Sequence, residues 1–71
     1  MLNIGQRVQY TEDGILSMIY GEVASWRFNE NTDQIEYKVN WDSECQKDNR
    51  FYPRCNLHLT DHANPHSKNS P

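Results

Sequence analysis

The fold is decided by the stretch Gln34-Ile35-Glu36-Tyr37-Lys38-Val39-Asn40-Trp41, in which apolar and polar residues alternate without interruption. Side chains alternate between the two faces of a β-strand, so the apolar residues of this stretch share one face and the polar residues the other. β-branched and aromatic residues also favour strands. One face to bury and one to hydrate is typical of an antiparallel sheet. The stretch predicts the central strand of a small β-barrel.

The residues before this stretch predict two further strands. Gln6–Tyr10 alternates in the same way, and Asp13-Gly14 is a strong turn signal because both residues tolerate positive φ. The periodicity of residues 15–28 fits either one helical stripe or a strand. We favour a strand, or a loop followed by a strand, because Gly21 disfavours a helix and suits a bend or a bulge. The polar turn 29–33 then makes a hairpin with the first stretch.

The residues after the stretch predict a polar loop, a short strand, one helical turn and a last strand, at 42–49, 50–52, 53–56 and 57–60. Pro53 ends the strand pairing because it has no N–H to donate, and it is tolerated in the first turn of a helix. Residues 61–71 contain no large apolar side chain, so we expect a disordered polar tail. The chain is therefore expected to be one all-β domain of five antiparallel strands at 1–60.

Composition narrows the possible functions. Among 71 residues, seven Lys and Arg face ten Asp and Glu, a net charge of -3 that disfavours general nucleic-acid binding. No apolar run approaches the roughly 20 residues that span a bilayer. The N-terminal residues do not resemble a signal peptide, so a cytoplasmic protein without a membrane partner is expected. Cys45 and Cys55 are expected to be free thiols in that compartment.

The order of these signals resembles the SH3-like barrels of the Tudor and chromo-barrel type. The residues that carry the resemblance are Gly5-x-x-Val8, Gly21-Glu22-Val23, Tyr37-x-Val39-x-Trp41-Asp42, and Tyr52 before a turn and Leu57. The chain is also similar to the small barrels of the hemimethylated-DNA-binding-protein-like family, in which a similar Gly-Gln-x-Val opening occurs. The resemblance covers residues 4–60 and implies a five-stranded antiparallel SH3-like barrel.

The resemblance also implies a candidate binding site. In Tudor-type barrels an aromatic cage holds a methylated Lys or Arg by cation–π attraction, and the candidate cage residues here are Tyr10, Trp26, Trp41 and Tyr52. The alternative is that these aromatic residues belong to the core. Trp26 is expected near a hairpin tip, on the face opposite Val23 and beside Arg27 and Phe28. This composition is typical of an interface hot spot, the alternative being an aromatic residue packed under the tip.

Polar residues suggest three further possibilities. An acidic patch that suits a basic partner would form if one end of the barrel held Asp42, Glu44, Glu30, Asp33 and Glu36. General acid–base catalysis by Asp42 and Glu44 requires a pocket that 71 residues have little room to form. No catalytic motif is present, so an enzyme is not expected. Some cysteines and histidines have a spacing that partly resembles that of zinc ligands. They are Cys45, Cys55, His58, His62 and His66.

We therefore expect a non-enzymatic module that needs no cofactor and binds another protein through Trp26, Arg27, Phe28 and the 42–49 loop. An accessory or inhibitory factor from a phage or mobile element is one form of this hypothesis. The first alternative is a nucleic-acid-binding barrel, whose basic residues would be Arg7, Arg27, Lys38, Arg50 and Arg54. The second alternative is a small zinc-binding module.

Overall fold

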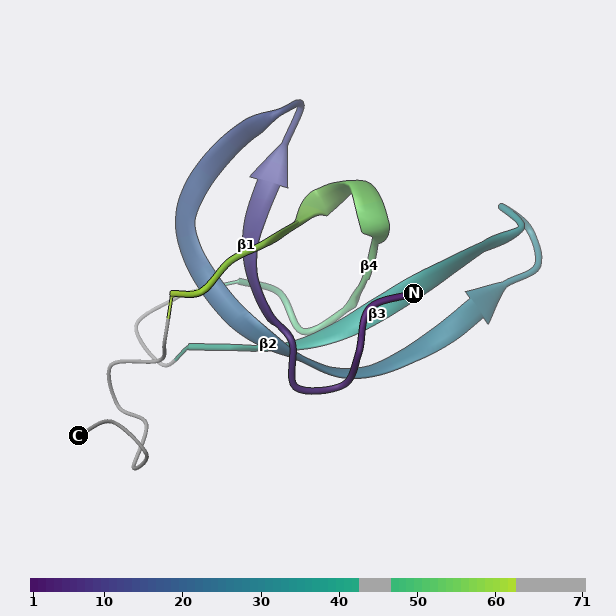
Figure 1. Cartoon of the computed structure of the whole chain (residues 1–71). Coiled ribbons are helices and arrows are strands. Elements are labelled where there is room, and N and C mark those ends of the chain that lie inside the picture. Colours follow the sequence, from purple (N-terminus) through teal and green to yellow (C-terminus); the bar gives the residue numbers. More distant parts are fainter. Residues whose placement is uncertain (43–46, 63–71) are drawn as a thin grey trace.

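Five antiparallel strands and one short 3-10 turn make up the fold of the residues that the structure describes (Figure 1). The computed structural model describes residues 1–42 and 47–62. The elements are β1 (Arg7–Glu12), β2 (Ile15–Asn29), β3 (Gln34–Trp41), β4 (Phe51–Pro53), η1 (Arg54–Asn56) and β5 (Leu57–Leu59). The predicted all-β class with five antiparallel strands is confirmed, as are the strand in residues 15–28 and the short turn after Pro53. In the described residues, no helix has the length and apolar character needed to cross a membrane.

The strands form a single sheet in the order β4-β3-β2-β1-β5. β3 has the predicted bounds, but the central strand is β2. Its 15 residues pair with β1 over the first half and with β3 over the second. The length of β2 therefore makes it, rather than β3, the strand that joins both halves of the sheet.

The sheet curls strongly but stays open. Figure 1 shows β2 bending so that η1 lies on the hollow side of the sheet. The edge strands β4 and β5 are joined by η1 and do not pair with each other in the described residues. One curled antiparallel sheet is thus confirmed, and closure into a barrel is not.

The core lies on the inner face of this curl. All five strands contribute to it, and its buried residues are Leu2, Val8, Tyr10, Val23, Tyr37, Val39, Tyr52 and Leu57. The apolar face predicted for residues 34–41 is confirmed, because Tyr37 and Val39 are each 2% exposed and Ile35 and Trp41 pack against them. Burial of these side chains is the main force that holds the curled sheet together.

Tight turns join the three long strands. Asp13 and Gly14 have φ values of +54° and +79° between the paired residues Glu12 and Ile15. Two consecutive positive φ values define the predicted type of two-residue hairpin, whose twist matches that of the flanking strands. In the second hairpin, the side chain of Asn29 accepts a hydrogen bond from the backbone N–H of Asn31.

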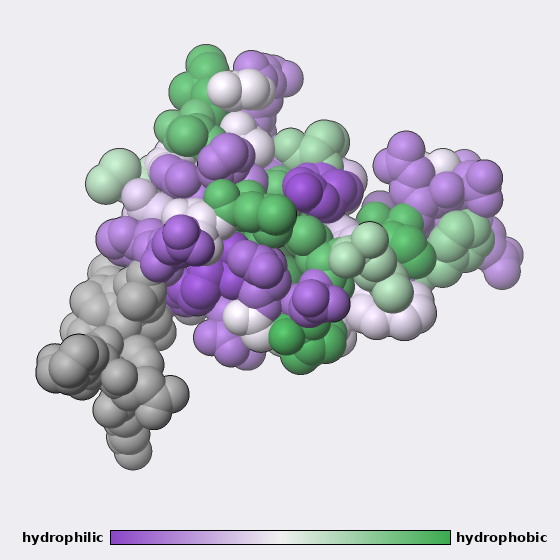
Figure 2. All heavy atoms as spheres, viewed as in Figure 1, coloured by the Kyte–Doolittle hydropathy of each residue, from purple (hydrophilic) through white to green (hydrophobic). Residues whose placement is uncertain are grey.

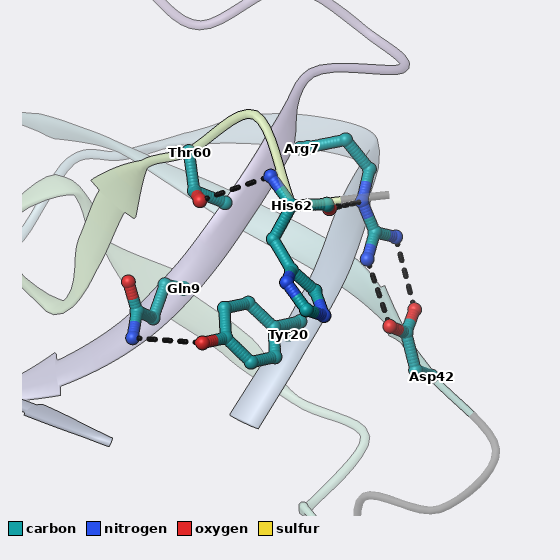
Figure 3. Close-up of polar contacts among 6 residues, drawn as sticks. All are labelled: Arg7, Gln9, Tyr20, Asp42, Thr60 and His62. Carbon is teal, nitrogen blue, oxygen red and sulfur yellow. Dashed lines mark hydrogen bonds and ion pairs between the residues drawn. The ribbon is translucent and has the colours of Figure 1, made fainter. Parts of the chain in front are cut away.

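A group of polar contacts on the outer face ties Asp42 and His62 to β1 (Figure 3). The guanidinium of Arg7 donates two hydrogen bonds, of 2.9 and 2.8 Å, to the carboxylate of Asp42, which is 4% exposed. Arg7 also donates to the backbone oxygen of His62, whose ring stacks on Tyr20 with centroids 3.8 Å apart. His62 belongs to the segment predicted to be a disordered tail, of which residues 63–71 lie outside the described part.

Candidate functional site

One extra residue in β2 decides which side chains face the hollow of the sheet. Val23 pairs with Val39, but the next paired residues are Ser25 and Lys38, so Ala24 is a bulge. Beyond the bulge, Trp26 pairs with Tyr37. Directly paired residues point to the same face, and Tyr37 is buried in the core. The expectation that Trp26 lies opposite Val23 is therefore wrong, because a one-residue bulge moves every later side chain to the other face.

The bulge creates an exposed apolar surface beyond the core. Trp26 and Phe28 are 47% and 50% exposed, and Phe28 pairs with the half-buried Ile35. Pairing with β1 ends at Glu22 and pairing with β4 ends at Glu36. The outer part of this hairpin, residues 25–36, is here called the β2–β3 arm, and beyond Arg27 and Glu36 it consists of these two strands alone. It projects from the sheet in Figure 1, and Figure 2 shows hydrophobic side chains on it.

Arg27 points away from Trp26 and Phe28. Its Nε and Nη2 donate to Oε1 of Glu36 at 3.0 and 2.9 Å, and its guanidinium lies 4.2 Å from the ring centroid of Phe51. Hydrogen bonds from Arg27, and then from Asn29, lower the pKa of Glu36. Trp26, Arg27 and Phe28 therefore do not form the single surface expected from the sequence, because neighbouring residues of a strand face opposite sides.

A groove adjoins the inner face of the arm. It has a volume of about 520 Å³ and is lined by Met1, Gln34, Ile35, Tyr37, Arg54 and Cys55. The N-terminal residues reach this region because the backbone N–H of Leu2 donates a hydrogen bond to the hydroxyl of Tyr37. Ile35 lines the groove and is paired with Phe28, so Phe28 lies next to a residue of the groove.

Three of the four candidate cage residues meet elsewhere. Tyr10, Trp41 and Tyr52 contact one another edge to face, with centroids 5.5 to 6.2 Å apart. Tyr10 and Tyr52 are 7% and 1% exposed, so these rings belong to the core cluster. The ammonium of Lys47 lies 3.8 Å from the Tyr10 centroid. The chain's own lysine thus occupies the place against these rings where a cage would hold the methylated Lys or Arg of a partner. Trp26 lies on the arm, outside this cluster.

The candidate acidic patch is not assembled in the described residues. Asp33 precedes β3 and Asp42 follows it, so the two lie at opposite ends of the strand. Asp42 is paired with Arg7 and Glu36 with Arg27, and Glu44 falls outside the described residues. The ion pair of Asp42 is internal, so this carboxylate supports the fold.

The basic residues proposed for nucleic-acid binding are only partly brought together. Arg27 and Lys38 flank the ring of Phe51, whereas Arg50 lies over Tyr52. Its hydrogen bond with Tyr52 raises the pKa of Arg50. The remaining two are Arg7, which contacts Asp42, and Arg54, which contacts the backbone oxygen of Leu57.

The candidate zinc ligands are only partly described, since Cys45 and His66 lie outside the described residues. Within residues 1–42 and 47–62, no group of three or more His, Cys, Asp or Glu side chains could hold a metal ion. Cys55 is an exposed free thiol in the groove.

No protein-family model, curated protein or solved structure matches the chain. The candidate site therefore rests on the positions and exposure of the described side chains. Sequence reasoning found Trp26 and Phe28 but missed the groove beside them. Ile35 was assigned to the core only, and no local signal links Arg54 to residues 34–37.

Proposed function

We propose that the protein is a non-enzymatic, cytoplasmic module that binds another protein through the inner face of the β2–β3 arm. The observation that carries this proposal is the half-exposed pair Trp26 and Phe28, held side by side on a paired strand. Aromatic side chains offer large contact areas and are enriched in binding hot spots. Contiguous apolar surface on a small domain is typical of an interaction site.

We further propose that the scaffold is an SH3-like barrel and that the protein acts as an accessory or inhibitory factor, as phages and mobile elements encode. The strong curl of the sheet and the 3-10 turn between β4 and β5 support the barrel proposal. The arm supports the proposed role, since it presents a binding face outside the core.

The test is affinity capture from a lysate of source cells with the wild-type chain and Trp26→Ala. Truncating a central hot-spot residue typically costs at least about 2 kcal/mol of binding, so the affinity for the captured partner should fall about 30-fold or more and its recovery should drop. Met18→Ala is the matched control, because Met18 is 80% exposed on the other hairpin and its truncation should not change capture. Thermal melting should show both variants folded. Equal recovery by wild type and folded Trp26→Ala would contradict the proposal.

A further inference from the structure

The charge of the groove differs from that of the whole chain. The chain carries a net charge of -3, yet Arg54 has the one charged side chain among the described residues that line the groove beside Ile35 and Tyr37. Glu36, between those two residues on β3, belongs to the outer face, where Arg27 binds its carboxylate. The groove is thus lined by apolar side chains, one amide and one cationic side chain, and the nearest carboxylate on its strand is directed elsewhere.

Arg54 has capacity for another acceptor. Its Nη1 donates to the backbone oxygen of Leu57, which anchors the side chain beside η1. Both ion pairs among the described residues involve other arginines. A guanidinium has five N–H donors and suits a carboxylate, which accepts two of them at once.

Resting on the function proposed above, we propose that this groove binds an extended apolar segment of the partner that carries a glutamate or aspartate side chain. The carboxylate lies against Arg54, and the apolar side chains of the segment pack on Trp26, Phe28 and Ile35. A volume of about 520 Å³ is within the range of binding clefts, about 300–1,000 Å³. A side-chain carboxylate fits better than a chain terminus, since termini are typically held by nests of backbone N–H groups.

The test uses fluorescein-labelled, acetylated and amidated nonapeptides of alternating leucine and threonine. One has glutamate at the centre, and a matched one has glutamine. Anisotropy titration with the wild-type chain should give about fivefold tighter binding of the glutamate peptide, as for a partly exposed ion pair of about 1 kcal/mol. General electrostatics would act in the opposite direction, because the chain is itself negative. The glutamate peptide should also slow alkylation of Cys55 by N-ethylmaleimide.

Variants of Arg54 separate charge recognition from structure. Arg54→Gln should make the two peptides bind equally, and Arg54→Lys should restore part of the preference. No detectable binding of either peptide at about 1 mM, equal binding by the wild type, or a preference that survives Arg54→Gln would each overturn the inference. If Trp26→Ala abolishes capture of the partner but one of these peptide results is obtained, the inference about the groove is overturned and the proposed function stands. If the wild-type chain prefers the glutamate peptide but Trp26→Ala captures the partner as well as the wild type does, the proposed function is overturned.

Discussion

At the scale of single residues, Gly21 is the position with the least space. It pairs with Val8 on one side and Trp41 on the other. A methyl group there would lie 2.6 Å from the backbone oxygen of Asn40 and 2.7 Å from Cγ1 of Val39. A backbone oxygen fixed in the sheet cannot move aside as a flexible side chain can, so glycine is required for close packing of the strands.

Gly21→Ala should therefore destabilise the protein by about 2–3 kcal/mol, the upper range for overpacking a dense site. Urea unfolding followed by circular dichroism measures the loss as a lower midpoint with an unchanged slope. Ser25→Ala is the control, since Ser25 is exposed on the same strand and its loss should stay within about 0.5 kcal/mol. Equal midpoints for the two variants would show that the strands can separate at Gly21 without cost.

At the scale of elements, the local signals predicted the strands and turns well. Period-two alternation gave β3, and Asp13-Gly14 gave the first hairpin, because each signal depends on residues that are neighbours in sequence. The face occupied by Trp26 could not be predicted, since a bulge at Ala24 exists only relative to β3. The pairing of Asp42 with Arg7 was missed for the same reason, because 35 residues separate them. The groove was missed because η1 and the N-terminal residues are brought to β3 by tertiary folding.

The bulge leads to a prediction for β2. Ala24 has no partner in the ladder, so its deletion leaves Val23 and Ser25 paired with consecutive residues of β3 and keeps Trp26 opposite Tyr37. The deletion should cost less stability than Gly21→Ala and preserve the nuclear Overhauser contacts between Trp26 and Tyr37. Deletion of Arg27, which is paired with Glu36, should cost more because it moves Phe28 opposite Glu36, onto the face away from Ile35. Loss of the Trp26–Tyr37 contacts on deletion of Ala24 would contradict the assigned register.

At the scale of the whole molecule, the sheet has two parts of different expected stability. The core takes side chains from every strand, so β1, β4 and β5 depend on one another. Beyond Arg27 and Glu36 the β2–β3 arm has only its two strands, an arrangement that is marginal in isolation. Since β2 runs through both parts, the arm is anchored to the core at Val23 but can open without unfolding it.

Hydrogen exchange should separate the two parts. Backbone amides of Val8, Val23 and Val39 should exchange only on global unfolding, and their exchange should quicken as low concentrations of urea are added. Protected amides in residues 27–35 should exchange through local opening, faster and with little dependence on urea. The same free energy and urea dependence for both groups would mean that arm and core unfold as one unit. Binding of a partner to Trp26 and Phe28 should slow exchange in the arm first, because a ligand that binds only the closed arm stabilises it by mass action.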